Sequence, residues 1–172
     1  MMKSPKAVII ILASAFCFLS LLDLAYGDKQ PKFSVEGKVY CDTCRVQFIT
    51  RLTQFMEGAT VRLECKKRGD EAVVSLVEGK TDSSGTYKLP VEGEHEEELC
   101  DIKLISSSMP DCSEKPKELH ADTHARVSLT DNNGIVSKTR KANPLGFLKE
   151  KPLPECPKVL QDLGMSTDDM IQ

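Results

Sequence analysis

Two closely spaced cysteines, Cys41 and Cys44, are the residues of this chain whose type and spacing could do chemistry. A Cys-x-x-Cys motif in a parallel α/β unit can be a redox dithiol, because a helix N-terminus makes the first thiol more acidic. With a second close cysteine pair, the same motif can bind zinc. In an exported chain, cysteines at such spacings usually belong to a disulfide framework.

The remaining cysteines favour the disulfide interpretation. The chain has seven cysteines, and Cys17 lies in an apolar N-terminal segment. The other four stand alone in the sequence, so no second close pair is available for zinc; they are Cys65, Cys100, Cys112 and Cys156. No alternation of strands and helices supports a thioredoxin-type unit. We therefore expect three disulfides, although six cysteines leave fifteen possible pairings open.

Other candidate ligands and nucleophiles lack a supporting context. His120 and His124 have the spacing of a helical metal pair, with Asp122 between them, but their segment lacks helical periodicity. His95 lies in an acidic stretch, residues 92–98, that lacks the alternating oxygen ligands of a calcium loop and that we expect to be solvated. The chain has no nucleophile elbow and no glycine-rich phosphate loop. We predict no metal site, no cofactor and no catalytic residue.

The N-terminus has the three parts of a secretory signal peptide. Lys3 and Lys6 precede an apolar run, residues 7–22, and Ala25-Tyr26-Gly27 follows it as a cleavage site. The run is shorter than the roughly 20 residues that span a bilayer, which disfavours the alternative of a membrane anchor. We expect residues 1–27 to be removed, leaving a single secreted, extracellular domain over residues 28–172.

Composition excludes some partners. The formal net charge is −3, and both signs are interspersed. No basic patch indicates nucleic-acid binding. After the signal segment, no apolar stretch is long enough to cross a membrane. Tryptophan is absent and aromatic residues make up 5%, so the core must consist mainly of Val, Leu and Ile.

Alternating apolar and polar residues predict an all-β fold. Residues 33–41 and 59–66 alternate most clearly, and further strands are expected at 73–77, 87–91, 99–105 and 127–129. Asp131-Asn132-Asn133-Gly134 predicts a hairpin turn, with residues 135–138 as the returning strand. Residues 45–56 fit either a bulged strand or a short helix. A short C-terminal helix is expected over 159–164, closed by Gly164. These elements indicate an antiparallel β-sandwich or barrel of about seven strands, held by three disulfides.

One stretch resembles the signature of the pollen Ole e I family: Glu36, Gly37, Lys38, Val39, Tyr40, Cys41, Asp42, Thr43, Cys44 and Arg45. The resemblance continues through residues 58–61, 81–87, 132–134, 142–147 and 156–157, and so covers nearly the whole chain after the signal segment. It is strongest to cereal and grass anther-specific members, which implies a flowering-plant source.

The resemblance implies a disulfide-bonded β-barrel without enzyme activity. It pairs Cys41 with Cys112, Cys44 with Cys156, and Cys65 with Cys100. It also implies a potential allergen and an extracellular binding or signalling protein in pollen hydration, germination or tube growth. The expected partner is a cell-wall component or an extracellular protein such as a receptor-kinase ectodomain.

Three segments are candidate binding loops: residues 92–98, 109–124 and 132–134. The alternative function is a small inhibitor of secreted hydrolases or proteases, presenting the segment Pro110-Asp111-Cys112.

Overall fold

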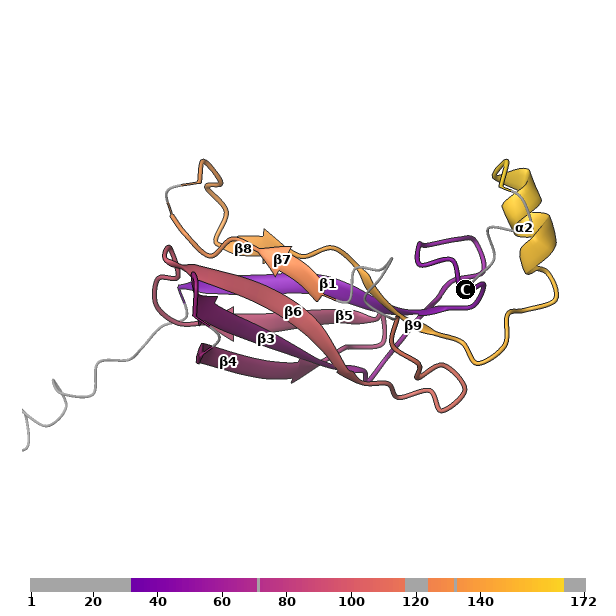
Figure 1. Ribbon diagram of the computed structural model, residues 1–172, viewed down its shortest axis with the longest axis horizontal. Helices are drawn as coiled ribbons and strands as arrows, with labels where there is room; N and C mark the ends of the chain where they lie inside the picture. Colours follow the sequence, from indigo (N-terminus) through magenta and orange to yellow (C-terminus); the bar gives the residue numbers. More distant parts are fainter. Residues whose placement is uncertain (1–31, 71, 117–123, 132, 166–172) are drawn as a thin grey trace, which may run out of the picture. The chain divides into compact units, whose positions relative to one another are not determined.

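The computed structural model describes residues 32–70, 72–116, 124–131 and 133–165. Its first sheet is built around β1 (Phe33–Asp42). Four strands pair with β1: β2 (Gln54–Phe55), β5 (Thr86–Val91), β8 (Thr139–Lys141) and β9 (Leu145–Leu148). The second sheet has the order β4 (Val73–Lys80), β3 (Thr60–Lys67), β6 (Glu98–Ser106) and β7 (His124–Val127) (Figure 1). One helix, α2 (Cys156–Asp162), follows the strands.

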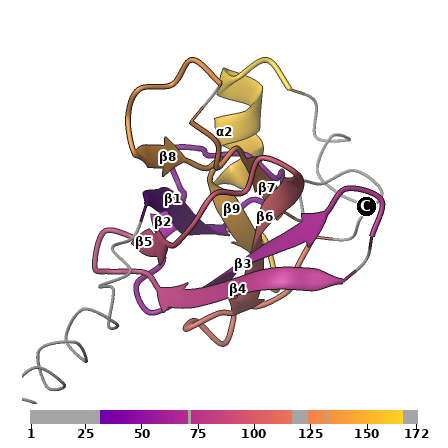
Figure 2. The same cartoon turned by 90° about the vertical axis from the view of Figure 1, so that its left-hand side faces the viewer.

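The two sheets form the layers of a sandwich (Figure 2). Their inward-facing residues alternate along each strand, as the sequence pattern predicts. In β1 these are Phe33, Val35, Val39 and Cys41, and in β3 they are Val61, Leu63 and Cys65. Together with residues of the other strands they form one hydrophobic core. The predicted all-β class is thereby confirmed as a sandwich with one short helix; the sheets do not close into a barrel.

Pairing around β1 is partly parallel, which the sequence did not predict. β5 runs antiparallel to β1, with Phe33 opposite Val91. β8 and β9 run parallel to β1, with Ser34 opposite Thr139 and Val39 opposite Leu145. Residues 142–144 separate β8 from β9, because Pro144 has no N–H to continue the ladder.

The predicted returning strand at residues 135–138 is wrong. Gly134 has the positive φ of 78° that a turn requires. The residues after it form an exposed loop instead of a strand, and Ile135 and Val136 project into solvent. The chain rejoins a sheet only at β8, one residue beyond the predicted strand.

Residues 45–53 form neither of the two elements considered for them. They make a series of turns, in which Arg45 and Gln47 have positive φ values of 57° and 63°. Only Gln54 and Phe55 pair with β1. The helical spacing of apolar residues here is therefore overridden by local backbone conformation.

Helix α2 begins three residues earlier than predicted. Pro157 occupies its first turn, where a missing N–H costs no hydrogen bond. At the other end, Met165 N–H donates to the Leu160 carbonyl at 2.9 Å and Gly164 N–H donates to the Gln161 carbonyl at 3.0 Å. This is a Schellman motif, and the positive φ of Gly164 (75°) closes it. No helix within the described residues is long and apolar enough to span a membrane.

Candidate functional site

The family-like signature lies along the second half of β1 and the turn that follows it. Gly37 faces the buried ring of Tyr87, and a Cβ atom on Gly37 would lie 2.2 Å from the Tyr87 hydroxyl oxygen. Burial raises the pKa of that hydroxyl. Tyr40 packs in the same way on Gly146 of β9, where a Cβ atom would lie 2.7 Å from the ring. Gly37 therefore leaves space for the Tyr87 ring, and Gly146 leaves space for the Tyr40 ring.

Asp42 organises the turn that follows β1 and runs to Gln47. Its buried carboxylate accepts hydrogen bonds from the backbone N–H groups of Cys44 at 3.2 Å and Gln47 at 2.5 Å. Burial raises the pKa of this carboxyl group, and the backbone donors act against that rise. The positive φ values of Arg45 and Gln47 bend the chain around the carboxylate.

Thr43 and Arg45 connect the turn to distant segments. The Thr43 hydroxyl donates to the Leu52 carbonyl at 3.0 Å. The Arg45 guanidinium donates to the Glu114 carboxylate at 2.8 Å and to the Lys149 carbonyl at 2.7 Å. The signature therefore binds three separate stretches of the chain around the end of β1.

Three disulfides join the pairs that the family resemblance implies: Cys41–Cys112, Cys44–Cys156 and Cys65–Cys100. All six half-cystines are buried. Cys41 and Cys44 are bridged to different segments rather than to each other, which is the arrangement of a structural framework and not of a redox dithiol. We call residues 41–45 with their two disulfides the signature clamp.

In the segment considered for protease inhibition, residues 110–112, backbone carbonyls accept hydrogen bonds from other groups of the same chain. The Asp111 carbonyl accepts a hydrogen bond from Glu150 N–H at 2.8 Å. The Pro110 carbonyl accepts one from the Ser113 hydroxyl at 3.2 Å. Asp111 and Pro110 are exposed, but the chain forms a turn there and not an extended segment that could bind in an enzyme's active site.

Two of the three predicted binding loops meet at the opposite end of β1. Asp131 N–H donates to the Glu94 carboxylate at 3.1 Å, and His95 N–H donates to the Leu129 carbonyl at 3.2 Å. Lys32 forms ion pairs with both Glu94 and Asp131. The third loop, 109–116, lies instead at the signature clamp, where Cys112 is bridged to Cys41. Residues 117–123 with His120 and Asp122, and Asn132, lie outside the described residues.

Arg140 holds the second of these loops in place, and sequence reasoning missed it. It is 3% exposed, and its guanidinium donates to three backbone carbonyls at 2.6–3.0 Å, those of Thr130, Ile135 and Ser137. Its charged group also lies 5.0 Å from the centre of the Phe33 ring. This cation–π contact and the three hydrogen bonds hold Thr130, Ile135 and Ser137 against the sheet.

The surface formed by the two loops carries an exposed apolar pair on one loop and exposed glutamates on the other. Ile135 is 51% exposed and Val136 is 95% exposed. Nearby on the other loop, four glutamates are exposed: Glu92, Glu94, Glu96 and Glu97. We call residues 92–97 and 133–138 the loop surface.

His95 is buried, which corrects the expectation of a solvated loop. It is 8% exposed. Its Nδ1 lies 2.7 Å from a Glu98 carboxylate oxygen, and its Nε2 lies 2.9 Å from the Glu92 carbonyl oxygen. The buried ring anchors the acidic loop from inside, while Glu92, Glu94, Glu96 and Glu97 around it are exposed.

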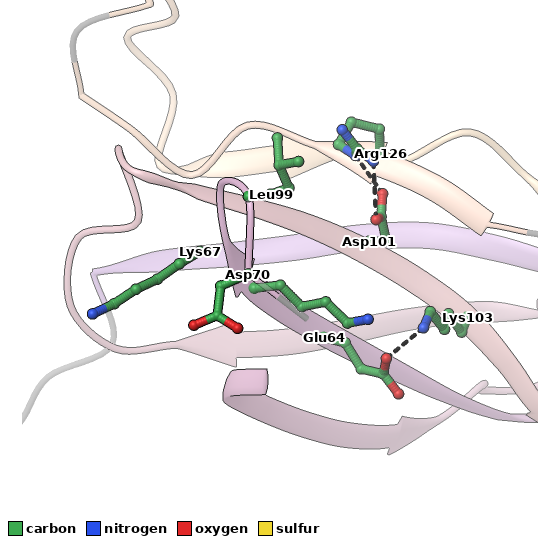
Figure 3. A pocket seen from close by; sticks show the side chains of 9 residues that line it. Glu64, Lys67, Asp70, Leu99, Asp101, Lys103 and Arg126 are labelled. Carbon is green, nitrogen blue, oxygen red and sulfur yellow. Dashed lines mark hydrogen bonds and ion pairs between the residues drawn. The ribbon is translucent and has the colours of Figure 1, made fainter. Parts of the chain in front are cut away.

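A hollow of about 350 Å³ on the charged side of the second sheet is a further candidate (Figure 3). It is lined by Glu64, Lys66, Lys67, Gly69, Asp70, Leu99, Asp101, Lys103 and Arg126. Two of its cations are paired with neighbouring carboxylates, Lys103 with Glu64 and Arg126 with Asp101. Such cross-strand pairs are typical of a solvated sheet face, and they leave these two cations committed to partners within the chain.

A β-sandwich held by three disulfides, with a clamp at one end and fixed loops at the other, defines a class of bridged β domains. The fold is similar to one in the solved structure titled "Crystal Structure of the Major Plantain Pollen Allergen Pla l 1". The TM-score is 0.66 at 43% sequence identity, and the match covers 72% of this chain and 98% of that chain.

Sequence comparison gives the family. The profile described as "Pollen protein Ole e 1 like" matches residues 31–164. An "Olee1-like protein" from Betula pendula is 56% identical over 164 residues, which cover 95% of this chain and 98% of that protein. "Pollen allergen Che a 1" from Chenopodium album is 45% identical, with 91% of this chain and 93% of that protein covered. The chain belongs to the pollen Ole e 1-like family.

Proposed function

We propose that this protein is a secreted, non-enzymatic binding protein of pollen that recognises an extracellular protein through the loop surface. Residues 1–27 would direct export and be removed in the process. The relatives support the pollen context, since several of them are named as pollen allergens, and one at 44% identity is the "Anther-specific protein LAT52" of Solanum lycopersicum. A role in pollen hydration, germination or tube growth, and allergenicity, belong to the same proposal.

The exposed pair Ile135–Val136 is the observation that carries the proposal. Two neighbouring apolar side chains that project from a fixed loop can bury apolar area against a partner, and exposed apolar patches often mark interaction sites. Arg140 already holds this loop by three carbonyl contacts. Binding would therefore require little further ordering of the backbone, which lowers its entropic cost.

The exposed glutamates suggest the chemistry of the partner. Glu92, Glu96 and Glu97 would complement Lys and Arg around an apolar pocket of the partner, whereas Glu94 is already paired with Lys32. An extracellular protein, such as a receptor-kinase ectodomain, supplies such a pocket more readily than a cell-wall polysaccharide does. Attraction between these opposite charges should weaken as the salt concentration rises.

A capture experiment tests the loop surface. The mature protein would be immobilised and incubated with pollen and pistil extracts, and bound proteins would be identified by mass spectrometry. Ile135→Asp should reduce capture of the specific partner by about tenfold or more, because it puts a charge into the exposed apolar pair. Leu76→Asp on β4 is the matched control, since Leu76 is 52% exposed and distant in sequence from both loops.

The outcomes separate the alternatives. Loss of capture in Ile135→Asp but not in Leu76→Asp supports the proposal. Equal capture by both variants would contradict it. Binding to cell-wall polysaccharide alone, or inhibition of an apoplastic protease, would replace it with another function. Turnover of an insulin-type disulfide substrate would overturn the non-enzymatic assignment.

A further inference from the structure

The Asn133–Gly134 pair of the loop surface joins a side-chain amide to an unhindered backbone nitrogen. It is the only Asn-Gly pair in the sequence, and both residues are exposed. Gly134 has a φ of 78°. Among the described residues, no atom beyond its chain neighbours lies within 4 Å of the position that a Cβ atom would take on Gly134. The Gly134 nitrogen and the atoms around it therefore have room to move.

The Asn133 side chain is folded back over its own backbone. Its Oδ1 accepts a hydrogen bond from Ile135 N–H at 3.1 Å, which makes an Asx turn. The ring closed by this bond contains the Gly134 nitrogen, so the side-chain amide carbon is turned toward that nitrogen. Its Nδ2 donates to the Ser128 hydroxyl oxygen at 3.0 Å. The Ile135 N–H lies on the oxygen that gains negative charge when a nucleophile adds to the amide carbon, and it would stabilise that charge.

We propose that Asn133 is a site of spontaneous deamidation, which goes beyond the proposed binding function. The Gly134 nitrogen loses its proton and attacks Cγ of Asn133, so that a C–N bond forms and a five-membered succinimide closes. The Cγ–Nδ2 bond breaks, and Nδ2 leaves as ammonia with one added proton. Water then opens the ring, giving its hydroxyl to one carbonyl carbon and its remaining hydrogen to the ring nitrogen. Attack at the side-chain carbon gives aspartate, and attack at the main-chain carbon gives isoaspartate.

The other two asparagines are less suited to this reaction. Asn143 is half-buried and precedes Pro144, whose nitrogen carries no proton to lose. Asn132 lies outside the described residues, and in the sequence it precedes Asn133, whose side chain hinders approach to the nitrogen. Deamidation should therefore be confined to Asn133.

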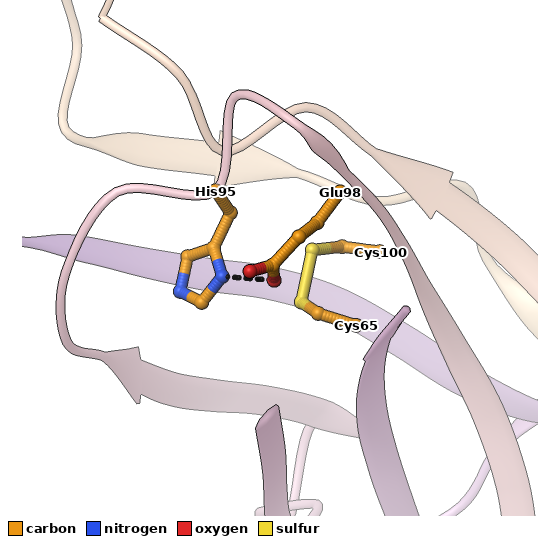
Figure 4. A group of neighbouring side chains, drawn as sticks. All are labelled: Cys65, His95, Glu98 and Cys100. Carbon is orange, nitrogen blue, oxygen red and sulfur yellow. Dashed lines mark hydrogen bonds and ion pairs between the residues drawn. A yellow bond between two sulfur atoms is a disulfide. The ribbon is translucent and has the colours of Figure 1, made fainter. Parts of the chain in front are cut away.

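Either product puts a new negative charge on the loop surface. Asp131, two residues earlier, already forms ion pairs with Lys32 and Lys138. The acidic loop beside it is held in place, because His95 Nδ1 lies 2.7 Å from a Glu98 carboxylate oxygen (Figure 4) and His95 N–H donates to the Leu129 carbonyl at 3.2 Å. The new carboxylate therefore adds to the negative charge of a surface whose acidic groups are already fixed.

Isoaspartate also lengthens the main chain by one carbon directly before Gly134. Arg140 holds the carbonyls of Ile135 and Ser137 at 3.0 and 2.7 Å. The longer backbone cannot keep both these contacts and the present turn, so the segment should loosen. Amide hydrogen exchange of residues 134–138 should be faster in the isoaspartate form, which ion exchange separates from the unmodified protein. Unchanged exchange would contradict this consequence.

Incubation of the mature, disulfide-bonded protein tests the site. Samples kept at neutral and at mildly alkaline pH would be digested at acid pH, which suppresses further reaction, and mapped by mass spectrometry. The peptide with Asn133 should gain the mass difference between oxygen and NH. The gain should be faster at the higher pH, because Gly134 must lose its amide proton. Protein-isoaspartate methyltransferase with labelled S-adenosylmethionine then measures the isoaspartate formed.

Two variants and one unfolded reference assign the reaction. Asn133→Gln should lose nearly all the methyl label, since its longer side chain must close a six-membered ring. Asn143→Gln is the matched control and should be labelled as the wild type is. The wild-type chain unfolded in urea with its disulfides reduced shows what the sequence alone does. The native protein should react at least as fast, because the Asx turn already brings the two groups together.

Four results would overturn the proposal. One is an Asn133 peptide of unchanged mass after incubation. Another is equal methyl labelling of Asn133→Gln and the wild type. The third is conversion at Asn132 or Asn143 in place of Asn133. The fourth is a native rate below that of the unfolded chain, which would mean that the turn protects the side chain. None of these results depends on the partner of the loop surface.

Discussion

Asp82 shows how one carboxylate can set a turn. Its Oδ1 atom accepts hydrogen bonds from Ser84 N–H at 2.8 Å, the Ser84 hydroxyl at 2.7 Å and Thr86 N–H at 3.0 Å. These donors, the Ser84 hydroxyl first, lower the pKa of Asp82 below its ordinary value of 3.8. Because the folded pKa is lower than the unfolded one, ionised Asp82 stabilises the native state above pH 3.8 and loses that effect as pH falls through the folded pKa.

Asp82→Asn should therefore lower stability in a pH-dependent way. The variant keeps a carbonyl acceptor but loses the charge, so it should be less stable than the wild type at about pH 6. The difference should shrink as the pH falls through the folded pKa of Asp82, because wild-type Asp82 then becomes protonated as well. Urea unfolding at several pH values measures this, and a gap that stays constant over the range would contradict the role of the ionised carboxylate.

Arg140→Lys tests whether the guanidinium fixes the loop surface. Lysine keeps the charge but cannot donate to three carbonyls from a planar fork, so the free energy of unfolding should fall by about 1–3 kcal/mol. Amide hydrogen exchange of residues 130–138 should become faster. Arg51→Lys is the control, since Arg51 is exposed and pairs only with Asp162 at 2.8 Å in the contacts described. Unchanged exchange in Arg140→Lys would contradict the assignment.

At this scale, sequence reasoning identified the cysteines but not the buried polar residues. The even number of cysteines predicted three disulfides, and the family resemblance supplied their pairing. Arg140 lies between Thr139 and Lys141, in a stretch that looks solvated. Its burial depends on the Phe33 ring, which comes from the other end of the chain. His95 was missed for the same reason, because its glutamate neighbours dominate the local pattern.

Gly85 shows how one turn joins strands of both sheets. It has φ +72°, and a Cβ atom there would lie 2.8 Å from the Val39 carbonyl oxygen and 2.8 Å from Phe55 Cβ. The turn between β4 and β5 is thus packed directly against β1 and β2. Only glycine satisfies both the backbone conformation and the close approach.

Gly85→Ala should destabilise the protein more than Gly69→Ala. Gly69 also has a positive φ of +78°, but no atom lies within 4 Å of its potential Cβ. Alanine at Gly69 should cost about 1 kcal/mol from the backbone conformation alone, whereas alanine at Gly85 adds a steric clash and should cost about 2–4 kcal/mol. Thermal unfolding of both variants measures the difference. Equal losses would show that the turn can move away from β1.

The long strands were predictable because one of their faces is buried. Alternation located β1 and β3 to within one or two residues, since period two places every second side chain in the core. The short strands β8 and β9 carry too few residues to show a period. They form because the edge of β1 away from β5 accepts their hydrogen bonds, which is a tertiary effect. Residues 135–138 form a loop because Arg140 holds their backbone carbonyls. The turn signal before them had predicted a returning strand.

The Cys44–Cys156 disulfide connects the whole described chain, from the signature to helix α2. It closes a loop with a sequence separation of 112 residues. Replacing both cysteines with serine should lower the free energy of unfolding by about 2–5 kcal/mol, mainly because the unfolded chain gains freedom. Urea unfolding measures the loss, and an unchanged midpoint would contradict it. The single variant Cys44→Ala leaves Cys156 unpaired and should also reduce secretion.

For the molecule as a whole, sequence reasoning reached the fold class and the family but not the surface. A lean core, many short strands and an even set of cysteines indicated a bridged β domain. The three candidate loops were chosen by composition, and composition cannot say which loops converge. The ion pairs of Lys32 with Glu94 and Asp131 bring two of them together, and the Cys41–Cys112 disulfide keeps the third at the other end of β1.

The central claim is that the signature clamp forms when the chain is exported and its cysteines are oxidised to disulfides. Peptide mapping of the native, unreduced protein by mass spectrometry tests it most directly. We predict an N-terminus at Asp28 and three linked peptide pairs that join Cys41 to Cys112, Cys44 to Cys156, and Cys65 to Cys100. A Cys41–Cys44 bridge, free thiols at these two positions, or a chain that retains residues 1–27 would contradict the account.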